Sequence, residues 1–428
     1  MGLIQAIHIK SKASIRENNA KNEGEYMKRV LIVSQHFPPE RSGCASRIHD
    51  MAVHLSSMGI DVSVISPHPT FPYGEFRRTW TPSTTQSIEG ITLVNLWSMQ
   101  PTSKDPGFIS RTLYFLIFPL HVAVWTLFHL RTFDVIITSD PPIFTHIPGI
   151  IMKKLFKKSW IIEVRDLWID ASISLGFLKK GSLYEKMARK FVNICLRNAD
   201  QIGVTTHELG KRLSHDEAIQ KKIVWLPNGV DTERFHPFNN AKKDQIIYAG
   251  NVGHAQDLEK VILAIKEVNK KFSLRFNIVG DGDINERLKD LVKSEGIEDV
   301  VIFTGVIARE KIPMMLSESL IGVAPLKKLE TLEYAAPTKV YEYMACGIPF
   351  LGCGNGEIAN IAQESGAGVI ADNTPNSIAY ALQDLLNDPQ KMEVMGQHGR
   401  EYVQKYYDRR AIAAKLKENI RRDVCKVT

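Results

Sequence analysis

Short apolar runs rich in Val, Ile and Leu alternate with amphipathic stretches along most of the 428-residue chain. Apolar runs of strand length separated by helical periodicity are typical of parallel sheets covered by crossover helices. The first half of the chain is predicted to contain strands at 29–34, 61–66, 91–96, 133–138 and 159–164, with helices at about 43–58 and 141–156. After Asp200, a second series of strands is predicted at 201–205, 222–226, 245–250, 274–280, 299–304, 319–324 and 348–352.

The chain is too long for one compact core, and the polar stretch 235–243 is the best candidate linker. We therefore expect an α/β protein with two Rossmann-like, doubly wound domains that face each other across a cleft. Ligands of such sheets bind outside the carboxyl ends of the strands, so functional residues are sought in those loops. The expected parts are a flexible extension at 1–26, an N-terminal domain at 27–235, a C-terminal domain at 236–408 and a crossover helix within 409–428.

One apolar segment, 112–130, contains no Lys, Arg, Asp or Glu, and its 19 residues are long enough to cross a bilayer. Pro119, His121 and His129 weaken a membrane span, and an expected strand follows within three residues. We favour a helix that packs on the N-terminal domain and whose outer face enters the membrane interface. A wholly buried core helix and a true span are the alternatives. Basic residues that would attract anionic lipid, or else form an ordinary solvated helix face, are Lys153, Lys154, Lys157, Lys158, Lys179 and Lys180.

Composition and charge argue against some classes of function. The chain is 44% hydrophobic and 24% charged, and its net charge of +7 is modest. Its basic residues are not arranged with aromatic residues into a surface that would bind a nucleic-acid strand, which argues against a nucleic-acid-binding protein. The five cysteines are scattered and form no CxxC pair, so we expect a reducing compartment and no zinc site.

The stretch 337–350 carries the strongest chemical signal. Pro337 cannot continue an earlier helix, so a helix is expected to start near Thr338. The free N–H groups of a helix N-terminus suit a phosphate, and Lys339 adds a full positive charge. Glu342, about one turn further on, could accept two hydroxyl hydrogen bonds from a ribose. This combination describes a nucleotide-sugar pocket; an amphipathic helix with a solvated Lys and Glu is the alternative.

Several expected strand ends lead into loops of small or charged residues. Asp281-Gly282-Asp283 is interpreted as a glycine turn that caps the next helix, without a metal. The other candidate loop residues are His36, Gly43, Glu163, Arg165, Asp166, Trp168, Gly250, Asn251, Gly253, His254, Gly280, Phe303 and Thr304.

From Lys28 onward, the chain resembles the GT-B glycosyltransferases of family 4, and most closely the bacterial N-acetylfucosaminyl transferases of surface-polysaccharide biosynthesis. The resemblance rests on 163–168, 226–231 with Phe235, 248–253, 278–282, 303–305 and 339–349. It implies retaining transfer from a nucleotide sugar without a required metal, with the donor on the C-terminal domain and the acceptor on the N-terminal one. The family often has a Glu-x7-Glu motif, but Tyr334 stands eight positions before Glu342, and Glu333 is out of register.

We accordingly expect Lys339, Glu342, Asp166 and Arg165 to serve catalysis. On the acceptor side we place His36, Gly43, Arg165, Asp166 and Trp168. The expected donor-binding residues are Gly250, Asn251, Gly253, His254, Gly280, Gly282, Phe303, Thr304, Tyr334, Pro337, Thr338, Lys339 and Glu342.

The expected donor is a UDP-sugar rather than a GDP-sugar, and the expected acceptor is a polyprenyl-diphosphate-linked sugar. The protein would then work in the cytoplasm, peripherally on the inner face of the plasma membrane. A nucleotide-sugar 2-epimerase of the same architecture, an NAD-dependent oxidoreductase and a non-catalytic assembly scaffold are the alternatives. The oxidoreductase lacks a GxGxxG loop followed by an acidic residue.

Overall fold

The computed structural model describes residues 28–40, 43–71, 73–101, 103, 106–174, 176–214, 216–329 and 332–424. The predicted extension at 1–26 lies outside these residues. Contacts divide the chain into two compact units. Unit 1 comprises Met1–Ile162, Asn198–Asp200 and Lys417–Thr428; unit 2 comprises Glu163–Arg197 and Gln201–Leu416.

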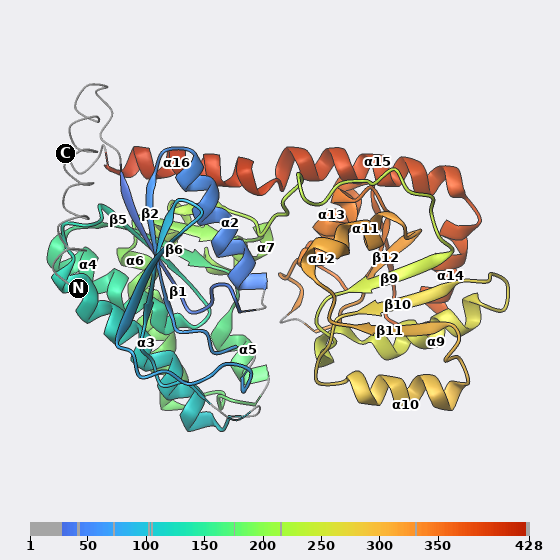
Figure 1. Cartoon of the computed structure of the whole chain (residues 1–428), viewed down its shortest axis with the longest axis horizontal. Helices are drawn as coiled ribbons and strands as arrows, with labels where there is room; N and C mark the ends of the chain where they lie inside the picture. The colour runs from blue at the N-terminus through green and yellow to red at the C-terminus, as the bar shows by residue number, and fades with distance from the viewer. Residues whose placement is uncertain are drawn as a thin grey trace. The chain divides into compact units, whose positions relative to one another are not determined.

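The strands of the first sheet are β1 (Arg29–Ser34), β2 (Asp61–Pro67), β3 (Ser83–Ile88), β4 (Ile91–Leu96), β5 (Val135–Ser139), β6 (Ser159–Val164), β7 (Gln201–Val204) and β8 (Ile223–Trp225). Their order in the sheet is β3-β4-β2-β1-β5-β6-β7-β8. Figure 1 labels β1, β2, β5 and β6 of this sheet. In register, Val30 of β1 lies between Val62 and Val135. The sequence pattern missed β3, which runs antiparallel to β4, because its residues are polar and exposed.

The helices along this part of the chain are α2 (Gly43–Ser57), α3 (Phe108–Phe128), η1 (Ile143–Thr145), α4 (His146–Phe156), α5 (Trp168–Ser174), α6 (Leu183–Asn198), α7 (His207–Leu213) and α8 (Glu217–Gln220). Helix α4 begins five residues later than predicted, after Pro141 and Pro142. A residue before proline is disfavoured in the helical region, so the two prolines delay the start.

The second sheet contains β9 (Gln245–Ala249), β10 (Arg275–Val279), β11 (Val301–Gly305), β12 (Ile321–Ala324), β13 (Phe350–Cys353) and β14 (Gly368–Ala371). Their order is β11-β10-β9-β12-β13-β14, and neighbouring strands are parallel. Alternate residues of β9 belong to two different buried clusters. Ile246 and Tyr248 pack in one cluster, and Ile247 and Ala249 pack in the other. The sheet is therefore covered on both faces. The two parallel-sheet α/β parts predicted from the sequence are confirmed.

The helices of this second part are η2 (His254–Gln256), α9 (Leu258–Val268), α10 (Asn285–Glu295), η3 (Arg309–Lys311), α11 (Ile312–Ser317), α12 (Thr338–Ala345), α13 (Glu357–Ser365), α14 (Pro375–Leu386), α15 (Pro389–Tyr406) and α16 (Arg409–Val424). Helix α16 starts in unit 2 and, from Lys417 onward, belongs to unit 1. Within unit 1, Lys417 donates from Nζ to the backbone oxygen of Met58 at 2.6 Å.

Helix α3 contains most of the apolar segment at 112–130, and it has two different apolar sides. Tyr114, Phe118 and Val122 are fully buried at four-residue spacing, and the helix contacts β2, β4 and α4 of unit 1. Val124 and Phe128 are instead 52% and 83% exposed. The alternative of a wholly buried helix is therefore wrong. Among the described residues, α3 is the one helix long and apolar enough to cross a membrane, but its packing against strands argues against lipid on all sides.

Candidate functional site

The N-terminus of α12 lies where the sequence placed it. Pro337 is extended, and Thr338 is the first helical residue. The helix has no side-chain N-cap hydrogen bond, so its first backbone N–H groups have no capping side chain in this structure. Such groups carry partial positive charge and can bind an anion.

Lys339, in the first turn of α12, is buried within unit 2, with 8% of its surface exposed. Its Nζ lies 3.1 Å from Oε1 of Gln256 and 3.8 Å from the ring centroid of Tyr248. Burial lowers the pKa of Lys339 to about 7, and the nearby carboxylate of Glu342 opposes that shift. The alternative in which Lys339 is a solvated surface residue is therefore wrong.

Glycine loops after β9 and β10 pack backbone against backbone beside this lysine. A Cβ built on Gly250 would lie 3.1 Å from Cε and 3.3 Å from Nζ of Lys339. Gly280 has a φ of +129°, and a Cβ there would lie 2.0 Å from the carbonyl oxygen of Gly250. At Gly282, a Cβ would lie 2.3 Å from the oxygen of Val252. The small residues that the sequence marked are thus required by close backbone contact near the ammonium group.

Replacing Gly280 with Ala should lower the free energy of unfolding by about 2–4 kcal/mol, because it combines a left-handed φ with a backbone clash. The matched control is Gly296→Ala, where φ is +65° but nothing lies within 4 Å of the added Cβ. That change should cost about 1 kcal/mol. Urea denaturation measures both, and equal losses would contradict the close contact with Gly250.

The other residues predicted on the donor side differ from one another in burial and in contacts. The Tyr248 hydroxyl donates to the backbone oxygen of Asn251, whose side chain is exposed, as is that of His254. A Cβ on Gly253 would lie 2.6 Å from Nδ2 of Asn251. Thr304 donates from Oγ1 to the Ile278 oxygen at 3.3 Å. Phe303 is partly buried and packs against a core cluster, so it has a structural role.

Glu342 faces a cation that sequence reasoning missed. Its Oε1 lies 3.4 Å from Nη2 of Arg309, and the Glu342 side chain is 14% exposed. Arg309 begins η3, shortly after β11, and its guanidinium also lies over the ring of Phe235, 5.4 Å from the centroid. The only sequence signal was its place soon after a predicted strand end.

Tyr334, at the position of the absent first glutamate, binds Asp166 within unit 2. Its hydroxyl donates to Oδ1 of Asp166 and accepts from the backbone N of Leu167 at 3.2 Å. Burial raises the pKa of Tyr334, and the Asp166 carboxylate raises it further. Thr206 donates from Oγ1 to the Tyr334 carbonyl oxygen at 2.7 Å. The structure thus joins one residue predicted on the donor side to one predicted on the acceptor side.

The neighbouring Glu333 and the loop after β13 also pack closely. The backbone N of Glu357 donates to the Glu333 oxygen at 2.7 Å, and a Cβ on Gly356 would lie 2.0 Å from that same oxygen. Glu357 is buried, which raises its pKa. It was not among the predicted site residues. Arg165 and Trp168 follow β6 in the same unit; the Arg165 oxygen accepts from Thr205 Oγ1 at 3.4 Å.

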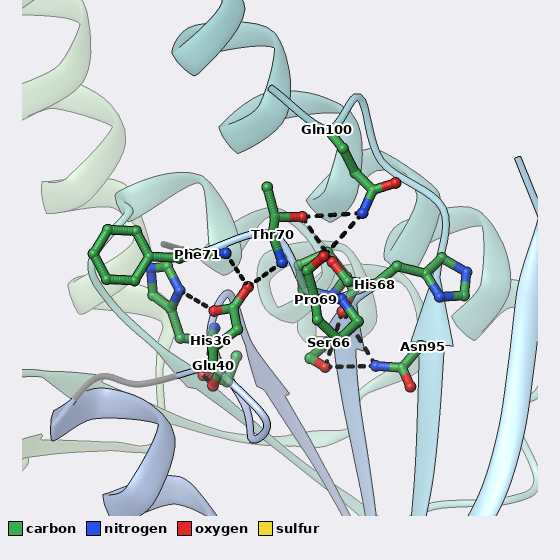
Figure 2. Close-up of polar contacts among 11 residues, drawn as sticks. His36, Glu40, Ser66, His68, Pro69, Thr70, Phe71, Asn95 and Gln100 are labelled. Atoms are coloured by element: carbon green, nitrogen blue, oxygen red, sulfur yellow. Dashed lines mark hydrogen bonds and ion pairs between the residues drawn. The ribbon is translucent and has the colours of Figure 1, made fainter. Parts of the chain in front are cut away.

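The two predicted residues of unit 1 differ from each other. His36 Nδ1 lies 2.6 Å from Oε2 of Glu40, whose Oε1 accepts from the backbone N of Thr70 at 2.7 Å and of Phe71 at 2.9 Å (Figure 2). This buried carboxylate, missed in the sequence, fixes the His36 ring through Nδ1, so Nε2 is the nitrogen that can face a ligand. A Cβ on Gly43 would meet nothing within 4 Å, so no close approach requires a glycine there.

A second network in Figure 2 holds the loop that donates to Glu40. Gln100 donates from Nε2 to the backbone oxygen of Pro69 at 3.0 Å. Asn95 donates from Nδ2 to Oγ of Ser66 at 3.0 Å. Ser66 and Asn95 lie near the ends of β2 and β4, and Gln100 follows β4, so neighbouring strand ends hold the loop that donates to Glu40.

Comparisons with known families cover most of the chain. Residues 41–234 match the family model described as Glycosyltransferase Family 4, and residues 230–402 match the model described as Glycosyl transferases group 1. Together, the two models span residues 41–402, which include the described strands of both sheets except β1.

Two relatives illustrate the sequence similarity. The putative colanic acid biosynthesis glycosyl transferase WcaI of Escherichia coli is 24% identical over 293 residues, which are 64% of this chain and 71% of WcaI. The GDP-mannose-dependent alpha-(1-6)-phosphatidylinositol monomannoside mannosyltransferase of Mycobacterium tuberculosis is 24% identical over 216 residues, 47% of this chain and 56% of that protein.

Two solved structures share the fold. Sucrose-phosphate synthase from Thermosynechococcus elongatus has a TM-score of 0.72 at 17% identity, over 93% of this chain and 100% of that one. Anabaena Alr3699/HepE in complex with UDP-glucose has a TM-score of 0.66 at 14% identity, over 92% and 99%.

Proposed function

The chain belongs to the glycosyltransferases of family 4 and group 1, and we propose that it transfers a sugar from a UDP-sugar to a lipid-linked acceptor in surface-polysaccharide biosynthesis. The observation that carries the assignment of the donor site is the buried Lys339 beside the glycine loops and the uncapped N-terminus of α12. The relatives and the family models support glycosyl transfer, not the epimerase alternative.

Departure of a nucleoside diphosphate is the difficult step of such a transfer. Negative charge develops on the leaving phosphate, so catalysis requires donors aimed at it. In our proposal, Lys339 and the first N–H groups of α12 supply them, with the Thr338 hydroxyl as a further donor. A bound anion would also restore the charge of Lys339, because an opposite charge favours the protonated amine. Glu342 would accept from the ribose hydroxyls while Arg309 fixes its carboxylate.

The choice of uridine rests on the solved structure of HepE with UDP-glucose. The mycobacterial relative uses GDP-mannose, so guanosine is the competing nucleotide. Thermal-shift measurements with UDP- and GDP-sugars separate the two, because a ligand that binds the folded state raises the melting temperature. A larger shift with GDP-sugars would overturn the uridine assignment.

On the acceptor side, we propose that Arg165, Asp166 and Trp168 of unit 2 position a sugar linked to polyprenyl diphosphate. His36 of unit 1 is a separate acceptor-side candidate. The transfer would retain the anomeric configuration, and the enzyme would act at the inner face of the plasma membrane. His36 is held by Glu40, and Asp166 by Tyr334, so each side chain has a fixed partner. The Gly43 assignment receives no support from its open surroundings.

The proposal is tested by incubating the protein with a UDP-sugar, with and without a polyprenyl-diphosphate sugar, and analysing the products by NMR. Product that forms only with acceptor, and keeps the anomeric configuration of the donor, is the expected result. An altered donor sugar without acceptor would indicate the epimerase instead. No reaction with any acceptor, in a protein that still binds UDP, would favour the scaffold.

A further inference from the structure

The outer side of α3 remains apolar in the folded protein. Val124 and Phe128 are 52% and 83% exposed, and Ile109, Leu120 and Leu127 are exposed as well. Helix α4, which contacts α3 within unit 1, adds the exposed side chains of Leu155 and Phe156. We call these seven residues the α3–α4 face. Soluble monomers rarely leave so many large apolar side chains uncovered in one region, so the face needs a partner.

The exposed charges at or just beyond the ends of α3 and α4 are basic, whereas the nearby Asp134 and Asp200 are paired with Arg29 and Lys153. Neither helix contains Asp or Glu. The exposed residues Arg131, Lys154 and Lys157 lie at or just beyond the ends of the two helices. Of the other basic residues marked in the sequence, Lys153 pairs with Asp200 at 2.5 Å, and Lys158 donates to the Phe133 oxygen at 2.6 Å. The charges that face outward therefore suit an anionic partner.

We propose that the α3–α4 face docks unit 1 onto a bilayer that contains anionic lipid, an inference that rests on the proposed lipid-linked acceptor. Apolar side chains that enter the interface, with Lys and Arg at the headgroups, are the two contributions that hold a peripheral helix on a membrane. A second copy of the chain fits less well, because a two-fold contact would bring the same basic residues together. Docking needs no span, since the inner side of α3 stays in unit 1.

The test is co-sedimentation of the full chain with vesicles. One set contains phosphatidylethanolamine and phosphatidylglycerol, and the other contains phosphatidylcholine alone. Wild type should bind the anionic vesicles, and binding should weaken with salt. The double variant Val124→Ser/Phe128→Ser should bind at least about tenfold more weakly, because two apolar side chains no longer enter the interface. Lys154→Glu/Lys157→Glu should also lose about tenfold, on anionic vesicles only.

Matched controls carry the same changes elsewhere on the chain. Tyr380→Ser/Val394→Ser removes exposed apolar side chains of α14 and α15, and Lys270→Glu/Lys289→Glu reverses two exposed charges. Both should bind vesicles like wild type. Wild-type binding in the α3–α4 variants, or equal loss in the controls, would overturn the proposal. So would retention on vesicles after alkaline carbonate, which indicates a span, or a dimer that the α3–α4 variants abolish in sedimentation equilibrium.

The same variants keep the two proposals separate. Each should retain the thermal shift that UDP causes in wild type, since Gln256 and Tyr248, which contact Lys339, belong to unit 2. Lost vesicle binding with an intact UDP shift then reports on docking alone. Absence of a UDP shift in wild type would instead count against the proposed donor site, whatever the vesicles show.

Discussion

Replacing Lys339 with Met should abolish transfer and at the same time stabilise the folded protein. Activity should fall by about 10²–10³ in kcat or more, because the cation aimed at the departing diphosphate is lost. Stability should rise because burial lowers the pKa of Lys339 to about 7 from its usual 10.5. At pH 8, folding must therefore leave the amine neutral, which costs on the order of 2–4 kcal/mol that Met does not incur. Steady-state kinetics and urea denaturation measure the two effects.

The size of this stability difference changes with pH in a defined way. Between pH 7 and 10.5, the unfolded chain holds a proton on Lys339 that the folded chain does not, so this group makes wild-type stability rise with pH. The gap between variant and wild type should be largest below pH 7 and should close as pH approaches 10.5. The control Lys270→Met, at an exposed position, should change stability by less than about 0.5 kcal/mol. A destabilised or fully active Lys339→Met protein would contradict the account.

The second large effect is expected at Glu342. Glu342→Ala should raise the KM for the donor by about 10- to 150-fold, since hydrogen bonds to a charged group contribute roughly 1.5–3 kcal/mol. The fold should survive, because the Glu342 side chain is still 14% exposed and its cationic partner Arg309 is 36% exposed. Glu310→Gln, one residue after Arg309 and exposed, is the control and should leave KM unchanged.

A separate measurement tests whether Glu342 binds the ribose. If Glu342 accepts from ribose hydroxyls, wild type should bind UDP more tightly than 2′,3′-dideoxyuridine diphosphate. In Glu342→Ala, the preference should largely vanish, because the two changes remove the same hydrogen bonds. Calorimetry with both nucleotides measures this coupling. An unchanged preference in the variant would show that Glu342 acts elsewhere.

The start of α12 could be predicted because it depends on local chemistry. Pro337 cannot continue an earlier helix, so a new helix is expected to start directly after it. The surroundings of Lys339 could not be predicted, because Tyr248 of β9 and Gln256 of η2 are more than eighty positions away in the sequence. A lysine at a helix start is usually solvated, and nothing local distinguishes a buried one.

Other side-chain contacts that the sequence did not predict also join residues far apart in the chain. Asp166 and Tyr334 are 168 positions apart, and their contact depends on tertiary packing. Arg309 and Glu40 lie in loops that the sequence marked only as strand ends. Strand β14 was missed because it is only four residues long and only Ala371 in it is buried, so its apolar pattern is weak. Long buried strands such as β1 were predicted correctly, since apolar residues dominate them.

The most direct test of the central claim measures how many protons the protein takes up when it binds UDP at pH 8. Titration calorimetry in buffers of different ionisation enthalpy gives this number. Free Lys339 is mostly neutral there, because its pKa is about 7. A diphosphate held against its Nζ would recharge it, so wild type should take up close to one proton and Lys339→Met none. Binding of UDP to wild type without proton uptake would contradict the claim that this lysine grips the leaving group.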